Sequence, residues 1–112
     1  MTQLIVYVKH YLTPEGIQYL QTEWFPQVIA EMSRHEGYLS CTYEISGDCV
    51  DFTIKFKDEP SFDAYAEVPN HNALAKKLDI YRSRNYWEAV RTLDADADPS
   101  SLQWDVIDPL HY

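Results

Sequence analysis

His71 is the side chain with the clearest capacity for chemistry in this sequence. It follows Pro69 and Asn70 and comes first in a helical stripe of apolar residues. The N-terminus of a helix disfavours a charged imidazolium, so a histidine there stays neutral and can accept a proton. We therefore predict that His71 is a catalytic base and that Asn70 positions a substrate beside it. The alternative is a half-buried histidine that only caps the break at Pro69.

Two acidic residues, Glu44 and Asp51, are expected to face each other on neighbouring strands. Like charges directly opposite one another destabilise a sheet, and such a pair tends to share a proton, bind a cation or recruit a base. Lys55, His10 and Arg91 are the candidate bases. We therefore interpret the pair as an acid–base or substrate-binding site. The alternative is an exposed pair at the end of a hairpin, where solvent screens the repulsion.

Aromatic residues are frequent, with nine tyrosines and three tryptophans in 112 residues. Rings that carry a hydroxyl or an indole N–H suit the binding of a flat aromatic or phenolic ligand. The alternative is that these rings fill a small core and a dimer interface. The aromatic residues that we predict to bind a substrate are Tyr7, Trp24, Tyr65 and Trp87.

Several kinds of catalytic and cofactor site have no counterpart in the sequence. Three glycines do not make a phosphate-binding loop, and neither a Gly-x-Ser-x-Gly elbow nor a Cys/His nucleophile pattern is found. Cys41 and Cys49 lack nearby histidines at zinc-ligand spacing, and we expect two free thiols. No metal and no cofactor are therefore expected, so any oxidation would rely on the substrate's own ease of oxidation.

A β-hairpin at Leu39–Phe56 is the element around which these residues are arranged. Apolar and polar residues alternate on both sides of a Ser-Gly-Asp turn, as in strands that are covered on one face only. A four-residue loop, Ser46–Cys49, keeps the apolar faces together by setting Tyr43 opposite Phe52. A slip of one residue would mix core with charge.

The other patterns complete a β-α-β-β-α-β order. The expected elements are a strand at Leu4–Tyr11, a helix from Thr13 that breaks near Pro26 and ends at Gly37, two helical stretches after Asp58 that are separated at Val68-Pro69, and a strand at Asn85–Leu93. Right-handed crossovers place the third strand between the first and second, and the fourth on the other side of the first. The predicted fold class is α+β: a ferredoxin-like, four-stranded antiparallel sheet with two helices on one face.

The chain is predicted to have one domain at residues 1–94 and a C-terminal tail at residues 95–112. Leu102, Trp104 and Val106 alternate like a short strand after an acidic break, so the tail is expected to pack on a surface, for which a partner subunit is one candidate. The face of the sheet without helices is half apolar, and pairing two copies is the simplest way to cover it. We therefore expect a homodimer.

The charge and hydropathy of the chain limit its partners. A net charge of −9 argues against nucleic acid and against an anionic membrane surface, because both attract basic patches. No apolar run approaches the roughly 18 residues of a membrane span, and the first residues lack the basic start of a signal peptide. We therefore expect a cytoplasmic protein.

With this order of elements, the chain resembles the dimeric α/β-barrel superfamily, and within it the antibiotic-biosynthesis-monooxygenase-like group. The resemblance extends from Leu4 to Leu93. It implies a dimeric barrel and a relationship to cofactor-free oxygenases of aromatic polyketides, haem-degrading enzymes, lactone isomerases and proteins without a known reaction. The motifs that carry it are Trp24-x-Pro26, Gly37-Tyr38-Leu39, Phe62-x-x-Tyr65 and Pro69-x-His71-x-x-Leu74.

The motifs of these relatives match the sequence only in part. Haem-degrading members use an Asn on the first strand, a Trp near the end of the third strand and a His on the second helix. Here the first strand has no Asn and the third ends at Phe56, so only His71 matches. The polyketide oxygenases use Asn and Trp residues around a pocket between sheet and helices, for which Asn70, Trp24 and Trp87 are candidates by residue type.

Two functional hypotheses follow. The first is a small-molecule-binding protein, by resemblance a cofactor-independent monooxygenase or related enzyme that acts on an aromatic or enolisable compound with His71 as the base. The second is a non-enzymatic ligand-binding or protein-interaction module of the same fold. A hydrophobic cavity of several hundred Å³ beside His71 would favour the first. A site packed shut by Tyr65, Trp24 and Leu74 would exclude it.

Overall fold

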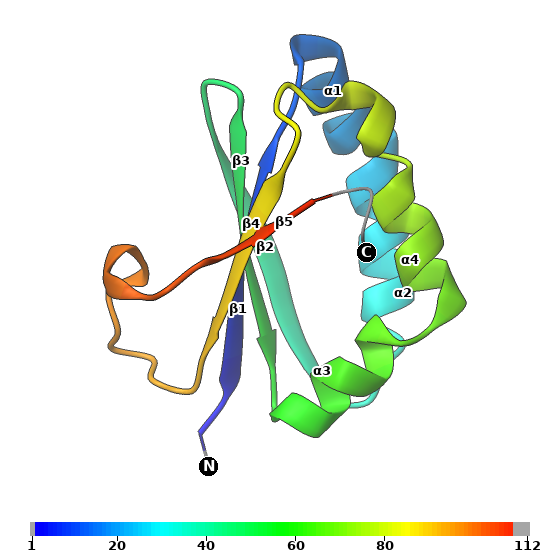
Figure 1. The fold of residues 1–112 in the computed structure, drawn as a ribbon. Coiled ribbons are helices and arrows are strands. Elements are labelled where there is room, and N and C mark those ends of the chain that lie inside the picture. Colours follow the sequence, from blue (N-terminus) through cyan, green and yellow to red (C-terminus); the bar gives the residue numbers. More distant parts are fainter. Residues whose placement is uncertain (1, 109–112) are drawn as a thin grey trace.

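The computed structural model describes residues 2–108, apart from the side chain of Asn70 (Figure 1). The α-helices lie on one face of an antiparallel sheet with the strand order β2-β3-β1-β4-β5. The strands are β1 (Leu4–Tyr11), β2 (Tyr38–Ser46), β3 (Cys49–Phe56), β4 (Trp87–Thr92) and β5 (Asp105–Ile107), and the helices are α1 (Pro14–Tyr19), α2 (Phe25–Met32), α3 (Glu59–Ala66) and α4 (Pro69–Lys76). The predicted α+β class and the order of the first four strands are confirmed. The tail, whose alternation indicated a short strand, adds β5 to the sheet as a fifth strand where four were predicted.

The β2–β3 hairpin has the predicted register. The expected cross-strand pairs are present, with Glu44 opposite Asp51 among them. The loop is shorter than predicted, because Ser46 and Cys49 still pair and leave only two residues between them. Gly47 is the first of these two residues and has a φ of 61°. Two-residue hairpin turns need a positive φ at this position, which glycine adopts without steric cost.

The first helical stretch begins after Thr13 and changes its helical geometry just before Pro26, as the sequence indicates. The hydroxyl of Thr13 caps α1 by accepting a hydrogen bond from the backbone N–H of Gly16 at 3.2 Å. Between α1 and α2 the chain makes a π-helical turn, Leu20–Trp24, just before Pro26. Proline has no N–H to donate, so the wider turn lies where the regular pattern of hydrogen bonds is interrupted.

The end of α2 differs from the prediction, which had the helix continue to Gly37. The helix ends at Met32, and Gly37 lies instead in the turn that leads into β2, with a φ of 90°. A Cβ on Gly37 would come within 2.6 Å of the Cβ of Ser61, so this turn approaches α3 as closely as only glycine allows. Asp58 caps α3, since its carboxylate accepts a hydrogen bond from the N–H of Ser61 at 2.9 Å.

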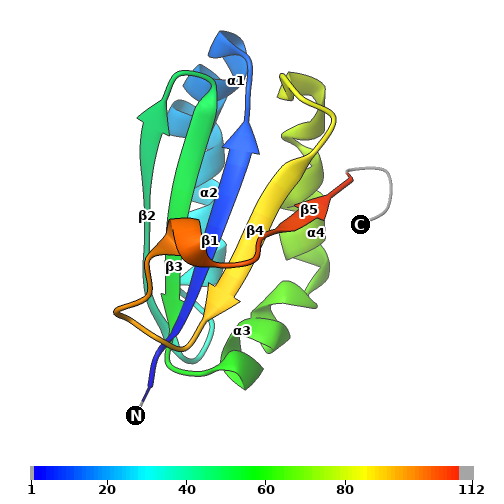
Figure 2. The same ribbon diagram turned by 60° about the vertical axis from the view of Figure 1, so that its left-hand side comes forward.

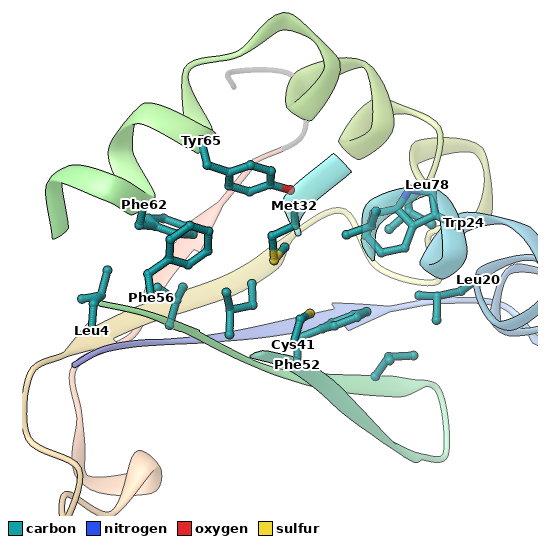
Figure 3. Packing of buried hydrophobic residues seen from close by; sticks show 14 of the residues in the cluster. Leu4, Leu20, Trp24, Met32, Cys41, Phe52, Phe56, Phe62, Tyr65 and Leu78 are labelled. Carbon is teal, nitrogen blue, oxygen red and sulfur yellow. The ribbon is translucent and has the colours of Figure 1, made fainter. Parts of the chain in front are cut away.

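The hydrophobic core lies between the sheet and the α-helices (Figure 3). Inward residues of β1 and β3 pack against the helical layer, which closes this face of the sheet. Among residues 2–108, no helix is both long and apolar enough to cross a membrane. The largest fully buried side chains are those of Phe56, Leu4, Leu12, Leu20, Met32, Leu78 and Val50.

The tail crosses the sheet on the face opposite the α-helices and then turns around its edge (Figure 2). A short 3₁₀ turn at Pro99–Ser101 lies over this face, and β5 then pairs with β4. Between them, the ring of Trp104 lies 6.4 Å from the ring of Tyr7 and 4.7 Å from Nζ of Lys9. The described part of the tail thus packs on its own sheet, and a contact with a partner subunit stays a prediction.

Candidate small-molecule site

A cavity of about 360 Å³ lies between the sheet and the helical layer. This volume is in the range of small-molecule sites, which are also mostly apolar with a few polar groups. Trp24 and Tyr65 line the cavity rather than fill it. The hydrophobic cavity that favours a small-molecule-binding protein is therefore present. The apolar side chains of its wall include Val6, Val8, Val28, Met32, Phe52, Ile54, Ala66, Ala75 and Ile107.

His71 is a half-buried residue of the cavity wall on α4. Its Nδ1 lies 3.4 Å from Oδ1 of Asn72, and an amide oxygen only accepts, so this contact suits the tautomer with the proton on Nδ1. Burial lowers the pKa of His71 below its ordinary value, although hydrogen bonds to Asn72 and Ala66 act in the opposite direction. The lowered pKa favours the neutral form of His71, and in the tautomer that donates to Asn72 the lone pair of Nε2 can accept a proton.

Tyr65 and Trp24 are two further predicted residues that the fold brings to the cavity. The ring of Tyr65 lies edge-on to His71 at 5.0 Å, and its hydroxyl points toward Met32 in the space between helices and sheet (Figure 3). Burial raises the pKa of Tyr65, so the hydroxyl stays a donor. The indole N–H of Trp24 donates to the backbone oxygen of Leu74 at 2.7 Å, so Trp24 presents only its ring to a ligand.

His10 is a cavity residue that the sequence analysis did not assign to this site. It is 6% exposed and lies among the rings of Trp24, Phe52 and Trp87, with centroids 6.1, 5.7 and 5.2 Å away. Burial first, and the charge of Arg82 second, lower the pKa of His10 to about 3. The signal that could have found it is the alternation of β1, which puts His10 on the inward face behind three apolar residues.

Tyr7, Glu44 and Asp51 lie away from the cavity and are absent from its wall. Glu44 and Asp51 do face each other, but the basic residue paired with Asp51 on β1 is Lys9, which was not among the three predicted candidates, Lys55, His10 and Arg91. Lys9 pairs with Asp51 from β1, so its positive charge lies on the same face as the acidic pair. A ligand of these three residues would occupy the open face of the sheet.

Of two other predicted site residues, Trp87 and Asn70, the structure describes the side chain of only the first. Trp87 lines the cavity from β4, whereas the side chain of Asn70 lies outside the described part of the chain. Cys41 also lines the cavity, but burial raises the pKa of its thiol to about 12, so it is not a nucleophile at neutral pH. Within residues 2–108, no group of three or more His, Cys, Asp or Glu side chains is placed to hold a metal ion.

Comparison with known proteins identifies the fold. No protein-family model and no curated protein sequence matches the chain. Among solved structures, SnoaB, a cofactor-independent oxygenase from Streptomyces nogalater, is 12% identical with a TM-score of 0.72 over 88% of this chain and 99% of that one. An antibiotic biosynthesis monooxygenase is 14% identical with a TM-score of 0.69 over 86% and 99%.

A conserved protein from Methanosarcina mazei Go1 is also similar, with 18% identity and a TM-score of 0.72 over 82% of this chain and 92% of that one. At these identities the likeness concerns the fold alone. The chain therefore has the fold of antibiotic-biosynthesis-monooxygenase-like proteins, as the motifs around Trp24, Tyr65 and His71 suggested.

Proposed function

We propose that this chain is a cofactor-independent monooxygenase that acts on an aromatic or enolisable small molecule. The observation that carries the proposal is the apolar cavity of about 360 Å³ with a neutral histidine, His71, on its wall. A flat ring can pack on the aromatic side chains of this wall. The likeness to a cofactor-independent oxygenase supports the choice of reaction.

In the proposed reaction, His71 removes a proton from the bound substrate through Nε2. The electron pair of the broken bond stays on the substrate as an enolate or phenolate, which is easier to oxidise than the neutral compound. Conversion of a CH₂ group to C=O by O₂ then gives one molecule of water, with one oxygen atom in each product. The substrate supplies all four electrons, so no external reductant is needed.

The role of Tyr65 follows from its contact with His71. Its ring lies edge-on to the imidazole at 5.0 Å, which limits the orientations that His71 can adopt. The hydroxyl of Tyr65 makes no hydrogen bond to a described residue and keeps its proton, so it is available to a polar group of the substrate. Trp24 and Trp87 provide the ring surfaces of the proposed site.

The test is oxygen uptake and quinone formation by the purified chain with anthrone, whose CH₂ group becomes C=O, without added cofactor and with a chelator present. We expect His71→Gln to lower kcat by at least about tenfold, because general-base catalysis typically contributes 10²–10⁴-fold. His35→Gln is the matched control, since His35 lies outside the cavity wall. Binding of anthrone without any turnover would contradict the enzyme and leave the alternative, a ligand-binding module.

A further inference from the structure

Arg82 places a positive charge directly behind the ring of His10. Its side chain is only 4% exposed, and its Nε donates to Oδ1 of Asp79 at 2.9 Å. Nη1 lies 3.1 Å from Nδ1 of His10. Nη2 is buried and has no hydrogen-bond partner among the described residues. A buried guanidinium with an unused donor is costly, so its position calls for an explanation beyond packing.

The contact with Arg82 fixes the proton of His10. A guanidinium has no acceptor, so Nδ1 of His10 must accept the hydrogen bond and Nε2 must carry the proton. Nε2 makes no hydrogen bond to a described residue, and His10 is part of the cavity wall. The wall therefore contains an N–H donor that is available to a ligand.

The rings that contact His10 carry no charge, whereas the carboxylate of Asp79, in an ion pair with Arg82, offsets part of the positive charge of the guanidinium. The π-helical turn contributes Trp24, β3 contributes Phe52 and β4 contributes Trp87, all of which are uncharged. Asp79 contacts the guanidinium through Nε, on a different nitrogen from the one that meets His10. Because side chains alternate along β1, Lys9 lies on the opposite face of the sheet from His10, where it contacts Trp104.

We propose that His10 is an oxyanion-binding residue, whose Nε2–H, polarised by Arg82, donates a hydrogen bond to a phenolate or enolate oxygen in the cavity. A donor backed by a cation in a largely apolar site stabilises negative charge more strongly than it would in water. The proposal rests on the proposed function and specifies its substrate class: compounds that bind as their anion. His71 takes the proton, and His10 holds the charge that remains.

The two histidines thus have different tasks. His71 keeps a basic lone pair, whereas the lone pair of His10 is already used by Arg82. His10 neither gains nor loses a proton in the step, because the proton leaves the substrate for His71 and the electron pair stays on the substrate oxygen. Loss of His10 should therefore change the acidity of a bound ligand and not only the rate of a reaction.

The experiment uses para-nitrophenol as the probe, since its anion and its neutral form absorb at different wavelengths. We expect the wild-type chain to lower the pKa of the bound probe, with at least a tenfold gain in ionised fraction at a pH below the solution pKa. His10→Phe should bring the pKa back to its solution value, and His10→Gln, which retains an N–H donor, should keep part of the shift. Nitrobenzene, a neutral analogue, should bind all three proteins with similar Kd.

The outcomes separate this inference from the proposed function. If nitrobenzene and the probe bind but His10→Phe shifts the pKa of the probe as the wild type does, His10 is not the oxyanion donor, and the small-molecule cavity stands. If neither compound binds the wild type, both proposals fail. Should His10→Phe not fold, Arg82→Gln tests the same step, and a shift as large as that of the wild type would overturn the role of the guanidinium.

Discussion

Nη1 of Arg82 lies 3.1 Å from Nδ1 of His10, although the two residues are 72 positions apart. This contact joins the segment before β4 to the inward face of β1, in the part of the core that contains the cavity. Burial first, and this contact second, keep His10 neutral inside an aromatic cluster, which affects the stability of the fold at different pH values.

The first prediction is that His10 makes the fold sensitive to mild acid. Its pKa falls from 6.5 to about 3 on folding, so below pH 6.5 the unfolded chain binds a proton that the folded chain excludes. The free energy of unfolding therefore decreases as the pH falls from 6.5 to 5, by up to about 1.4 kcal/mol per pH unit. His71 acts in the same direction, because its pKa is also lowered.

Urea unfolding at several pH values between 7 and 5 measures this slope. His10→Gln should make it shallower, because the variant has no titrating group at this position. His35→Gln, outside the cavity wall, is the control for the loss of a histidine as such. Equal slopes for the wild type and His10→Gln would show that His10 is protonated in the folded state as easily as in the unfolded chain.

The second prediction concerns the hydrogen bond that Trp24 donates to the backbone oxygen of Leu74 at 2.7 Å. Trp24→Phe should lower the free energy of unfolding by about 1–3 kcal/mol, because the partner oxygen loses its donor in a partly buried place. Trp104→Phe removes a comparable bond, to the oxygen of Pro99 at 2.8 Å, from the tail. In chemical denaturation we expect Trp104→Phe to lower the free energy of unfolding by less than Trp24→Phe does. A larger loss for Trp104→Phe would contradict the prediction that the Trp24 hydrogen bond contributes more to stability.

The third prediction tests the cavity by filling it. Ala75 on α4 belongs to the wall, so Ala75→Met should weaken the binding of nitrobenzene at least about tenfold while the fold is kept. Ala73→Met is the matched control, because Ala73 is an exposed residue of the same helix. Calorimetry measures the Kd of nitrobenzene for both variants, and circular dichroism checks that both are folded. Unchanged binding by Ala75→Met would mean that the ligand lies elsewhere.

The fourth prediction is that the chain forms a homodimer in which the tail takes part. Light scattering should give twice the chain mass of 13.1 kDa. A chain that stops at Asp98 lacks Trp104, which packs on Tyr7 and Lys9 of the open sheet face, and lacks β5. Loss of the dimer on truncation would support a tail at the subunit interface, and an unchanged oligomeric mass would refute that role.

The alternation of residues in the strands was sufficient to predict the sheet. It set Glu44 opposite Asp51, because in a half-covered sheet only one register keeps the apolar faces together, whereas the position of β3 beside β1 followed from right-handed crossovers. The alternation of the tail indicated a short strand but not its pairing with β4, because that pairing depends on the exposed edge of β4 rather than on the pattern of β5 itself.

The candidate site was only partly accessible from the sequence. Trp24, Tyr65, His71 and Trp87 were selected by residue type, and the fold gathers them because each faces the space between sheet and helices. Tyr7 was predicted by residue type, and Glu44 and Asp51 because the register sets them opposite each other, but all three lie on strand positions away from the cavity wall. His10 depends on Arg82, and no local pattern indicates a contact between residues so far apart.

The short pairing of β5 bears on how a ligand enters the cavity. Asp105 and Ile107 belong to the cavity wall, and β5 is fastened to β4 through three residue pairs at the margin of the sheet. Marginal segments with few pairs detach at a much lower free energy than a domain unfolds. We expect the amide hydrogens of β5 to exchange before those of the other strands, so that this side of the cavity opens while the rest of the sheet stays paired.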